Sequence, residues 1–338
     1  MTETISIVVP CFNESEVLPL LFQRLESLPQ IEDIQYEFVF VDDGSQDDTW
    51  EQVRSFARAM SGSQAIRLSR NFGHQKALWS GLERATGDAV FVIDADLQDP
   101  PELIEQFVNE WKIGNEVVYG VRQKRKENLF KRIAYKSFYR LLKNVADIEI
   151  PLDAGDFCLM DRKVVDAILV QKDSSPFIRG ARAWVGYEQV PLEYERNARA
   201  AGKEKYGLKQ LMDLAINGLF SYSKKPVRWI LNLGIALIFC SIVWGTACMV
   251  TAFTTMDLWS LETSTALIVL AVGMATGLNL TALGVVGEYM VKTMEAVQGR
   301  PVSIVAEVVA NETVQSGVET LPLETNQTAA QETLRKAA

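Results

Sequence analysis

The chain has 338 residues, of which 48% are hydrophobic, and carries a formal net charge of -9. This length suits one or two folded domains, and the acidic balance disfavours a protein that binds duplex nucleic acid. The four cysteines form no C-x-x-C pair, which indicates buried thiols in a reducing compartment, with neither a disulfide framework nor a zinc site. The N-terminus lacks the features of a signal peptide, so we expect the first domain to fold in the cytosol.

Apolar runs alternate with amphipathic segments along the first part of the chain. The runs predict strands at residues 5–10, 36–45, 65–70, 89–96 and 116–122. The intervening segments predict helices within residues 13–28, 47–60, 74–86 and 100–112. Because the strands are continuously apolar, we expect an α/β fold with a mostly parallel sheet and helices on both of its faces.

Polar residues follow each predicted strand, and in such a sheet these positions converge on the edge where ligands bind. They are residues 10–14, 42–45, 70–75, 94–99 and 120–122. Taken singly, the segments NES and SQDD can be helix caps, and DDGS can be a turn. No G-x-G-x-x-G follows the first strand and no P-loop occurs, so neither a dinucleotide fold nor a P-loop protein is indicated.

The segment DADLQ ends the fourth predicted strand and crowds carboxylates that should repel one another. Oxygen ligands of this kind hold Mg²⁺ or Mn²⁺, commonly together with the phosphates of a bound nucleotide. Asp94, Asp96 and Gln98 are therefore candidate metal ligands. The alternative is a set of solvated acids before a helix that begins at Pro100 and Pro101.

Two apolar segments, residues 227–253 and 264–290, each exceed the ~20 residues that span a bilayer. Lys and Arg flank the pair but are absent between Trp229 and Val291, so both ends should be cytoplasmic. We expect a two-helix transmembrane hairpin, although a buried hairpin in a soluble protein is an alternative. The expected divisions are a cytosolic domain at 1–207, interfacial helices at 208–226, the spans with a non-cytosolic loop at 254–263, a cytosolic segment at 291–305 and a disordered tail at 306–338.

The order of the motifs resembles that of a known family. The motifs are VVPCFNE, VDDGSQDDT, RNFGHQKAL, DADLQDPPE, GVR, AGDFCLMDR, RGARAWVG, RNARAAGKEKY and FSYSKKP, followed by the two apolar segments and by GEYM and GRP. Over residues 5–305 this arrangement is similar to the polyprenyl-phosphate glycosyltransferases. The resemblance implies an inverting enzyme of the GT-A (Rossmann-like) fold, a nucleotide-diphosphate sugar donor, Mg²⁺ or Mn²⁺, a polyprenyl phosphate acceptor in the membrane, and a homotetramer.

The resemblance also implies roles for individual residues. Those expected to bind the nucleotide are Pro10, Phe12, Glu14, Asp42, Asp94 and Ala95. The metal would be held by Asp94, Asp96 and Gln98. Phosphates of the donor or acceptor would be bound by Arg122, Lys131, Arg132, Ser137, Arg199 and Lys205. One departure concerns the last of these, because Glu204 stands in GKEKY where the family usually has serine.

Catalytic roles fall on Asp96 and on Asp156, which the resemblance implies to be a base. A phosphate acceptor is mostly ionised at neutral pH, so Asp156 can instead position a basic partner. His74, the only histidine, is expected to be structural or to shape the donor site. Between Arg122 and Lys143 there are nine Lys or Arg and one acid, which suits either an acceptor phosphate at an anionic membrane or a solvated helix face.

We therefore expect transfer of one sugar from UDP-glucose to undecaprenyl phosphate at a bacterial inner membrane, with the catalytic domain and both termini cytoplasmic. GDP-mannose, UDP-N-acetylglucosamine and a UDP-aminoarabinose are alternative donors, since no residue separates them. A catalytically inert membrane scaffold or a lipid-sugar carrier is the alternative from another class.

Overall fold

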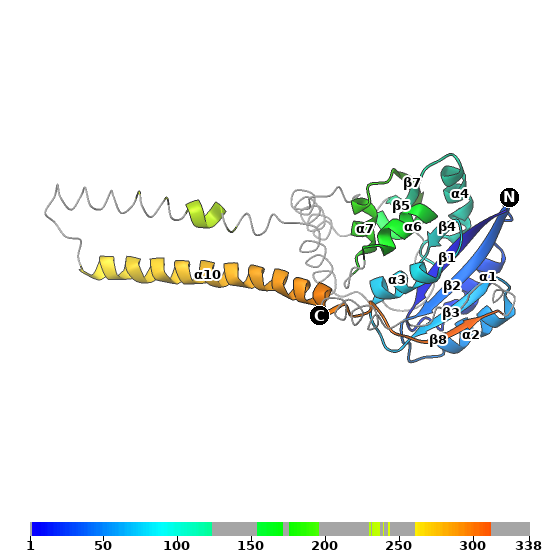
Figure 1. Ribbon diagram of the computed structural model, residues 1–338, viewed down its shortest axis with the longest axis horizontal. Coiled ribbons are helices and arrows are strands. Elements are labelled where there is room, and N and C mark those ends of the chain that lie inside the picture. The colour runs from blue at the N-terminus through cyan, green and yellow to red at the C-terminus, as the bar shows by residue number, and fades with distance from the viewer. Residues whose placement is uncertain are drawn as a thin grey trace, which may run out of the picture.

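The computed structural model describes residues 2–123, 154–171, 176–195 and 261–311, together with a few positions between 230 and 243. These residues form an eight-stranded sheet flanked by helices, and one long helix that extends away from it (Figure 1). The strands are β1 (Glu3–Cys11), β2 (Ile34–Asp42), β3 (Ser63–Leu68), β4 (Ala89–Val92), β5 (Val117–Gln123), β6 (Ala154–Asp161), β7 (Gln189–Glu195) and β8 (Val305–Ala310). The helices are α1 (Leu18–Glu26), α2 (Thr49–Ala59), α3 (His74–Arg84), η1 (Pro101–Leu103), α4 (Ile104–Lys112), α6 (Arg162–Leu169), α7 (Ile178–Trp184) and α10 (Leu261–Gln298).

The strand order is β7-β5-β6-β4-β1-β2-β3-β8, and it corrects the expected sheet in one respect. Strands β4, β1, β2 and β3 are parallel, as predicted. However, β6 lies between β4 and β5 and is antiparallel to both. The pattern of β6 was not recognised as a strand because Gly155 and Asp156 interrupt its apolar run. The sheet is therefore mixed, and β6, one of its antiparallel strands, carries the candidate catalytic residue Asp156.

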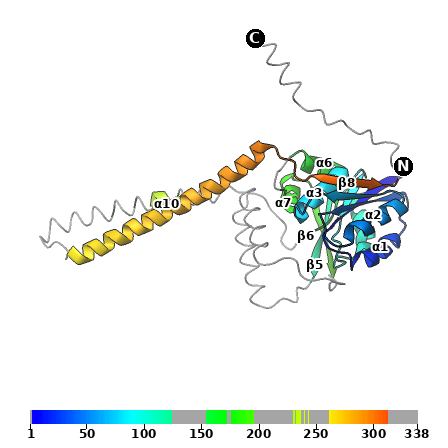
Figure 2. The same cartoon turned by 90° about the horizontal axis from the view of Figure 1, so that it is seen from below.

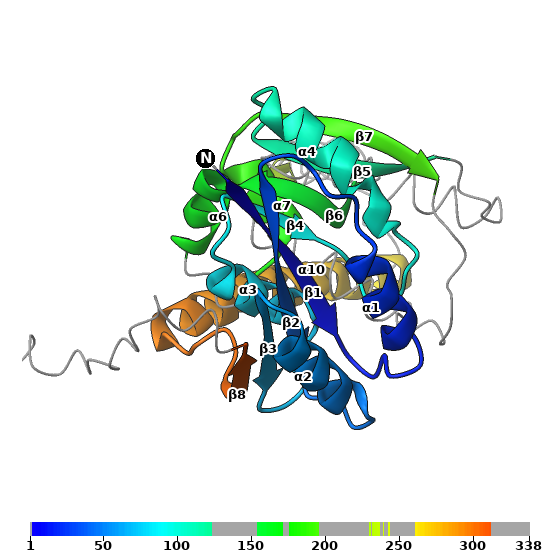
Figure 3. The ribbon, with the colours of Figure 1, turned by 90° about the vertical axis from the view of Figure 1, so that its right-hand side faces the viewer.

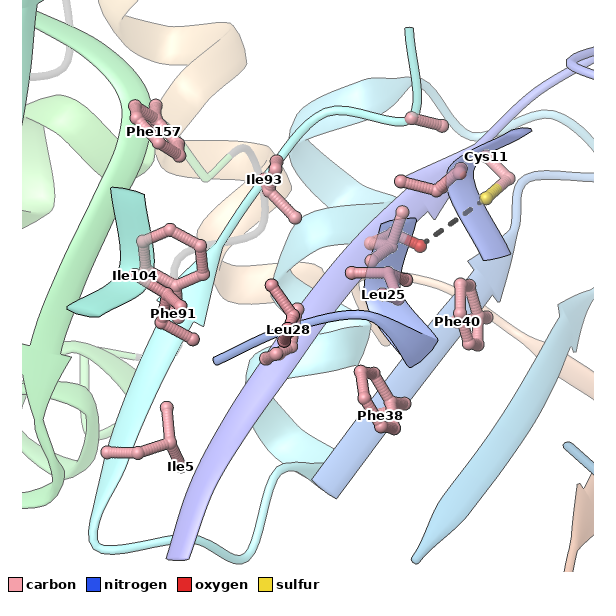
Figure 4. Close-up of a cluster of buried hydrophobic side chains, with 14 of the residues drawn as sticks. Ile5, Cys11, Leu25, Leu28, Phe38, Phe40, Phe91, Ile93, Ile104 and Phe157 are labelled. Atoms are coloured by element: carbon pink, nitrogen blue, oxygen red, sulfur yellow. Dashed lines mark hydrogen bonds between the residues drawn. The ribbon is translucent and has the colours of Figure 1, made fainter. Parts of the chain in front are cut away.

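Helices cover both faces of the sheet, as expected (Figure 3). In β1, Ile7 packs on the core beneath α1, α2 and α4, whereas the next residue, Val8, packs on the core beneath α3, α6 and α7. Figure 4 shows the first of these cores, in which the rings of Phe91 and Phe157 meet edge to face, 5.2 Å apart. Cys11 and Cys158 are buried free thiols, which confirms the expectation for the described cysteines.

Strand β8 corrects the expectation of a disordered tail from residue 306. It pairs antiparallel with β3, with Val309 opposite Ala65 and Val308 opposite Ile66. The composition of the whole tail concealed a short segment, VAEVVA, that is rich in β-branched residues. Without β8, strand β3 would be a sheet edge with unpaired amide groups. Residues 312–338 lie outside the described part of the chain.

Helix α10 has 38 residues and extends from the sheet domain (Figure 1, Figure 2). Large apolar side chains are exposed along it, among them Ile268, Val272, Leu280, Leu283, Met290, Met294 and Val297. Within the described ranges, no helix satisfies the length and hydropathy required of a membrane span. The second predicted span, residues 264–290, falls inside α10, and the first, residues 227–253, lies mostly outside the described residues.

Candidate active site

Three strand ends bring the predicted site residues to one edge of the sheet. Asp42 ends β2 opposite Cys11, the last residue of β1. Strand β4 ends at Val92, two residues before Asp94. Because β6 is antiparallel to β4, with Cys158 opposite Val92, Asp156 lies just beyond the end of β4. Carboxylates from three strands therefore meet at the edge where parallel sheets bind ligands.

The segment after β4 forms a tight turn around acidic side chains. Leu97 has φ 58°, an uncommon conformation for leucine, and the backbone N–H of Gln98 donates to Asp96 Oδ1 at 3.1 Å. Asp96 and Asp99 are buried, whereas Asp94 is partly exposed. Asp94 Oδ1 is nevertheless buried and accepts no hydrogen bond. Burial and the charges of neighbouring carboxylates raise the pKa of Asp94 to about 6, against the opposing effect of His74.

The donor set of this turn fits a hard cation. Asp94 and Asp96 offer carboxylate oxygens and Gln98 an amide oxygen, which are ligands that Mg²⁺ and Mn²⁺ accept. The buried oxygen of Asp94 without a hydrogen-bond partner is an atom that such a cation would satisfy. Within the described ranges, no group of three or more His, Cys, Asp or Glu side chains is arranged to hold a metal ion by itself. A cation here would need further oxygens, such as those of a diphosphate.

Asp156 is held by basic and amide groups on both of its oxygens. Arg179, on α7, donates from Nε to Oδ1 at 2.8 Å and from Nη2 to Oδ2 at 3.1 Å. Gln75 Nε2 donates to Oδ2 at 3.0 Å, while Gln75 Oε1 accepts from the N–H of Ile178. Burial would raise the pKa of Asp156, but Arg179 and His74 outweigh it and hold the pKa well below its ordinary range. This carboxylate is a firmly paired anion, which is a poor acceptor for a further proton.

His74 begins α3 and lies between two of the acids. Its Nε2 is 3.4 Å from Asp156 Oδ2 and 3.6 Å from Asp94 Oδ1. Burial disfavours the charged imidazole, but the hydrogen bond to Asp156 and the charge of Asp94 raise its pKa to about 9. At neutral pH His74 is therefore a cation that joins the predicted metal turn to Asp156, and its ring is turned toward carboxylates.

Arg122, a predicted phosphate-binding residue, is anchored beside this turn. Its Nη2 lies 3.8 Å from Asp99 Oδ2, and its Nε donates to the hydroxyl of Tyr194 at 3.4 Å. Tyr194 in turn donates to Asp99 Oδ1. Gly120, the first residue of the GVR motif, must be glycine, because a Cβ there would lie 2.7 Å from the rings of both Phe157 and Tyr194. The motif thus fixes the direction from which Arg122 reaches the site.

The two aspartates of DDGS have different partners. Asp43 accepts the backbone N–H groups of Phe72 and Gly73, at 2.7 and 2.9 Å, and so holds the loop that leads into α3. Asp42 is fully buried and accepts the N–H of Ser45 on one oxygen, while Oδ2 has no hydrogen bond and lies 3.7 Å from Arg67 Nε. Burial raises the pKa of Asp42. The DDGS segment is a turn, as the alternative interpretation stated, but its first acid also has an unsatisfied oxygen.

A cavity of about 250 Å³ lies next to Asp42, at the ends of β2 and β3. It is lined by Gly44, Ser45, Arg67, Leu68, Ser69, Arg70, Ala306 and Glu307. Gly44 is required there, because it has φ 68° and a Cβ would lie 2.5 Å from the backbone of Arg70. Strand β8 therefore forms one wall of the cavity. The predicted nucleotide-binding residues are not part of this lining: Pro10 lies in β1, Phe12 and Glu14 follow β1, and Ala95 follows β4.

Sequence reasoning assigned no role to Arg179, Gln75, Asp43 or Asp99, although all four lie in segments that it singled out. For Asp43 and Asp99 the available signal was a further acid directly after a predicted site residue. Five predicted phosphate-binding residues fall outside the described part of the chain. They are Lys131, Arg132, Ser137, Arg199 and Lys205. Arg122 is therefore the one predicted phosphate-binding residue that the described part of the chain includes.

The chain is similar to several known proteins. The model of the family "Glycosyl transferase family 2" matches residues 6–169. The uncharacterized glycosyltransferase YkcC of Bacillus subtilis is 42% identical over 89% of this chain and 92% of its own length. A prophage bactoprenol glucosyl transferase homolog of Escherichia coli is 32% identical over 90% and 99% of the two chains. The bactoprenol glucosyl transferase of Shigella phage SfII is 32% identical over 89% and 97%.

Among solved structures, glucosyl-3-phosphoglycerate synthase from Mycobacterium tuberculosis, in complex with Mn²⁺, UDP and glucosyl-3-phosphoglycerate, is 21% identical to this chain. Its TM-score is 0.42 over 65% of this chain and 79% of that one. The full-length relatives, the matched family and the GT-A-like mixed sheet with helices on both faces support one conclusion. The chain belongs to glycosyl transferase family 2, and within it to the polyprenyl-phosphate glycosyltransferases.

Proposed function

We propose that the protein transfers a single sugar from a nucleotide-diphosphate sugar to a polyprenyl phosphate, with inversion at the anomeric carbon. UDP-glucose and undecaprenyl phosphate are the proposed substrates. The names of the relatives, bactoprenol glucosyl transferases that match over nearly their whole length, support both choices. Glycan modification of the cell envelope is the proposed use of the lipid-linked sugar.

One observation carries the proposal. Asp94 Oδ1 and Asp42 Oδ2 are buried and accept no hydrogen bond, and both lie at the carboxyl edge of the sheet. Each has a basic group nearby, His74 Nε2 at 3.6 Å from Asp94 and Arg67 Nε at 3.7 Å from Asp42, but neither is hydrogen-bonded to it. Buried carboxylate oxygens without a hydrogen bond are costly unless a ligand completes them. A cation at Asp94 and an N–H or hydroxyl of a nucleoside at Asp42 would satisfy both oxygens. A nucleoside diphosphate with its metal is a ligand that has both groups.

Asp94, Asp96 and Gln98 would hold a divalent cation, Mg²⁺ or Mn²⁺. When bound, the cation would neutralise charge on the diphosphate that leaves the sugar. Arg122, fixed by Asp99 and Tyr194, would contribute a second positive charge to the same phosphates. The ion pair with Asp99 keeps the Arg122 guanidinium in place. The side chain of Arg122 is still 20% exposed, so it can reach a ligand in the site.

In the proposed reaction, an oxygen of the acceptor phosphate attacks the anomeric carbon as the bond to the diphosphate breaks. The second pKa of a phosphate monoester is about 6, so the acceptor is an anion at neutral pH and no proton needs removal. Asp156 therefore need not act as a base. Its two oxygens already accept from Arg179 and Gln75, which supports a role in holding these groups beside the acceptor.

We also propose that the catalytic domain and both termini face the cytoplasm of a bacterial cell, with α10 and the segment before it in the inner membrane as a hairpin. The exposed apolar side chains along α10 support this, because a soluble protein rarely leaves such a surface uncovered. Assembly into a homotetramer is part of the same proposal, and mass determination of the purified, detergent-solubilised chain tests it.

The test is transfer by the purified full chain, with labelled donors, undecaprenyl phosphate and Mn²⁺ or Mg²⁺. UDP-glucose should give the highest rate in a panel that includes GDP-mannose, UDP-N-acetylglucosamine and a UDP-aminoarabinose. A chelator should stop the reaction. Asp96→Ala should abolish transfer while leaving the protein folded, whereas Asp166→Ala, at an exposed position on α6, should keep full activity. Undiminished transfer by Asp96→Ala would contradict the assignment.

An inert scaffold and a lipid-sugar carrier are the competing functions. A scaffold would bind the acceptor lipid but release no nucleotide from any donor in the panel. A carrier would move preformed lipid-linked sugar across vesicles without using a nucleotide sugar. Release of the nucleoside diphosphate together with a lipid-linked sugar distinguishes the proposed enzyme from both.

A further inference from the structure

A second cavity, of about 320 Å³, lies between α3 and the C-terminal end of α10. Three of its lining residues are basic: Arg70 before α3, Lys76 on α3, and Arg300 after α10. Glu295 is the one acid in the lining. None of the ion pairs found among the described residues involves Arg70, Lys76 or Arg300. In a protein with a net charge of -9, the cavity therefore collects an excess of positive charge.

The segment after α10 is fixed against the sheet domain, so the cavity is a built feature. The N–H of Ser69 donates to the carbonyl of Ile304 at 2.8 Å, and the hydroxyls of Ser80 and Ser303 are 2.5 Å apart. Val302 packs on the core beneath α3. Figure 1 and Figure 2 both show the end of α10 meeting the domain beside α3. Arg300 and Lys76 thus line the same cavity, and the residues that follow Arg300 in sequence are fixed to the sheet domain.

The cavity is also partly apolar. Phe72, Pro301, Val302 and Ile304 complete its wall, and the guanidinium of Arg70 lies 4.3 Å above the ring of Phe72. The last turns of α10, next to the cavity, expose Val291, Met294 and Val297. A ligand that fits this surface has an anionic head and an apolar chain. Arg and Lys grouped in this way are typical phosphate ligands.

We propose that this cavity binds the phosphate of a membrane lipid, whose apolar chain follows the last turns of α10. The inference rests on the proposed function only in placing α10 in a membrane. The cavity and the candidate active site both include a residue of the first turn of α3, Lys76 in the cavity and His74 in the site. A bound lipid phosphate would therefore hold the first turn of α3, and with it the catalytic edge, against the bilayer.

The test measures lipid binding to the full chain in a neutral detergent, by native mass spectrometry and by competition for a fluorescent phospholipid. The probes are farnesyl phosphate, short-chain phosphatidylglycerol, farnesol and inorganic phosphate. Farnesyl phosphate and phosphatidylglycerol should bind, and farnesol and inorganic phosphate should bind at least tenfold more weakly. The stronger of the two lipid phosphates identifies the source, acceptor or bulk lipid. Equal binding of farnesol, or of inorganic phosphate, would overturn the proposal.

Substitutions locate the site. Lys76→Gln and Arg300→Gln should each weaken lipid phosphate binding about fivefold, and together about thirtyfold, since each basic residue near a membrane phosphate contributes a similar amount. Arg300→Lys should restore most of the affinity. The matched control is Arg58→Gln with Arg84→Gln, two exposed arginines outside the cavity, which should leave binding unchanged.

Glu295→Gln gives a result that misfolding cannot imitate. Removal of the one acid in the lining should strengthen lipid phosphate binding about fivefold. Wild-type affinity in the Lys76 and Arg300 double variant would overturn the proposal, even if sugar transfer is confirmed. Conversely, loss of binding in that variant supports the cavity even if no donor in the panel is used, so the two proposals fail separately.

Discussion

Two carboxylates at opposite edges of the sheet, the buried Glu37 and the partly exposed Asp94, differ in how their oxygens are satisfied. Glu37, in β2, accepts from Gln64 Nε2 and Thr86 Oγ1 on one oxygen, and from Ser6 Oγ and the N–H of Thr86 on the other. Asp94, beyond the end of β4, has a buried oxygen that accepts nothing. Both side chains lie beside central strands, yet only Glu37 has all its hydrogen bonds made by the protein.

The difference indicates which acid serves the fold and which serves a ligand. A buried carboxylate whose oxygens are satisfied belongs to a structural network, and removing it leaves its donors unpaired. A carboxylate left unsatisfied is a cost to the fold that persists where a ligand completes it. A substitution of Asp94 should therefore lower activity and not stability, and a substitution of Glu37 should lower stability and not activity.

The largest expected effect is on transfer by Asp94→Asn. The change removes a proposed metal ligand and should lower kcat/KM at least about 1000-fold, which corresponds to about 4 kcal/mol of barrier. The unfolding temperature should stay the same or rise, because the buried oxygen of Asp94 makes no hydrogen bond that the change would break. Steady-state kinetics and thermal unfolding followed by tryptophan fluorescence provide both measurements. A large fall in the unfolding temperature would show that Asp94 is structural.

Glu37→Gln should do the reverse. The amide cannot accept four hydrogen bonds, so buried donors such as the Thr86 N–H lose a partner, and we expect a loss of about 2–4 kcal/mol of stability. The unfolding temperature should fall by about 5–15 °C. The folded fraction should transfer sugar at a rate near that of the wild type. Glu51→Gln, at an exposed position on α2, is the matched control and should change neither quantity.

These contrasts also show what could be predicted from the sequence. Apolar periodicity predicted strands β1 to β5 and the helices between them, and motif order predicted the converging loops. The sequence did not show that Asp42 and Asp43, which are adjacent, have different hydrogen-bond partners. The partners of Asp43 come from the loop before α3, and Arg179 reaches Asp156 from α7. Which buried oxygens are hydrogen-bonded depends on groups that packing brings together, so a local sequence pattern does not predict it.

A smaller effect is expected at Asp156, which lies between the two extremes because its oxygens are satisfied by groups of the site itself. Asp156→Asn and Arg179→Gln should each lower kcat/KM about 30-fold if the pair works as one unit. The double variant should then be no worse than either single variant. Losses that multiply to about 1000-fold would show independent roles and would support Asp156 as a base.

The smallest effect is expected where the ion pair of a carboxylate is exposed to solvent. Glu102 receives two hydrogen bonds from Arg24, but its side chain is 48% exposed. The hydrogen bond from Arg24 lowers the pKa of Glu102. A lowered folded pKa stabilises the fold above the pKa of the unfolded chain, about 4.3, and the contribution is lost as the pH falls through the folded value.

Glu102→Gln should therefore cost at most about 1 kcal/mol at pH 7, as for other exposed ion pairs. The difference in unfolding temperature between the variant and the wild type should shrink as the pH falls below about 4, and it should shrink in high salt at pH 7. Thermal unfolding across pH and salt measures both trends. A difference that grows toward low pH would mean that the folded protein favours the protonated form of Glu102, as it does for a buried acid. The distinction between buried and exposed acids would then fail at this position.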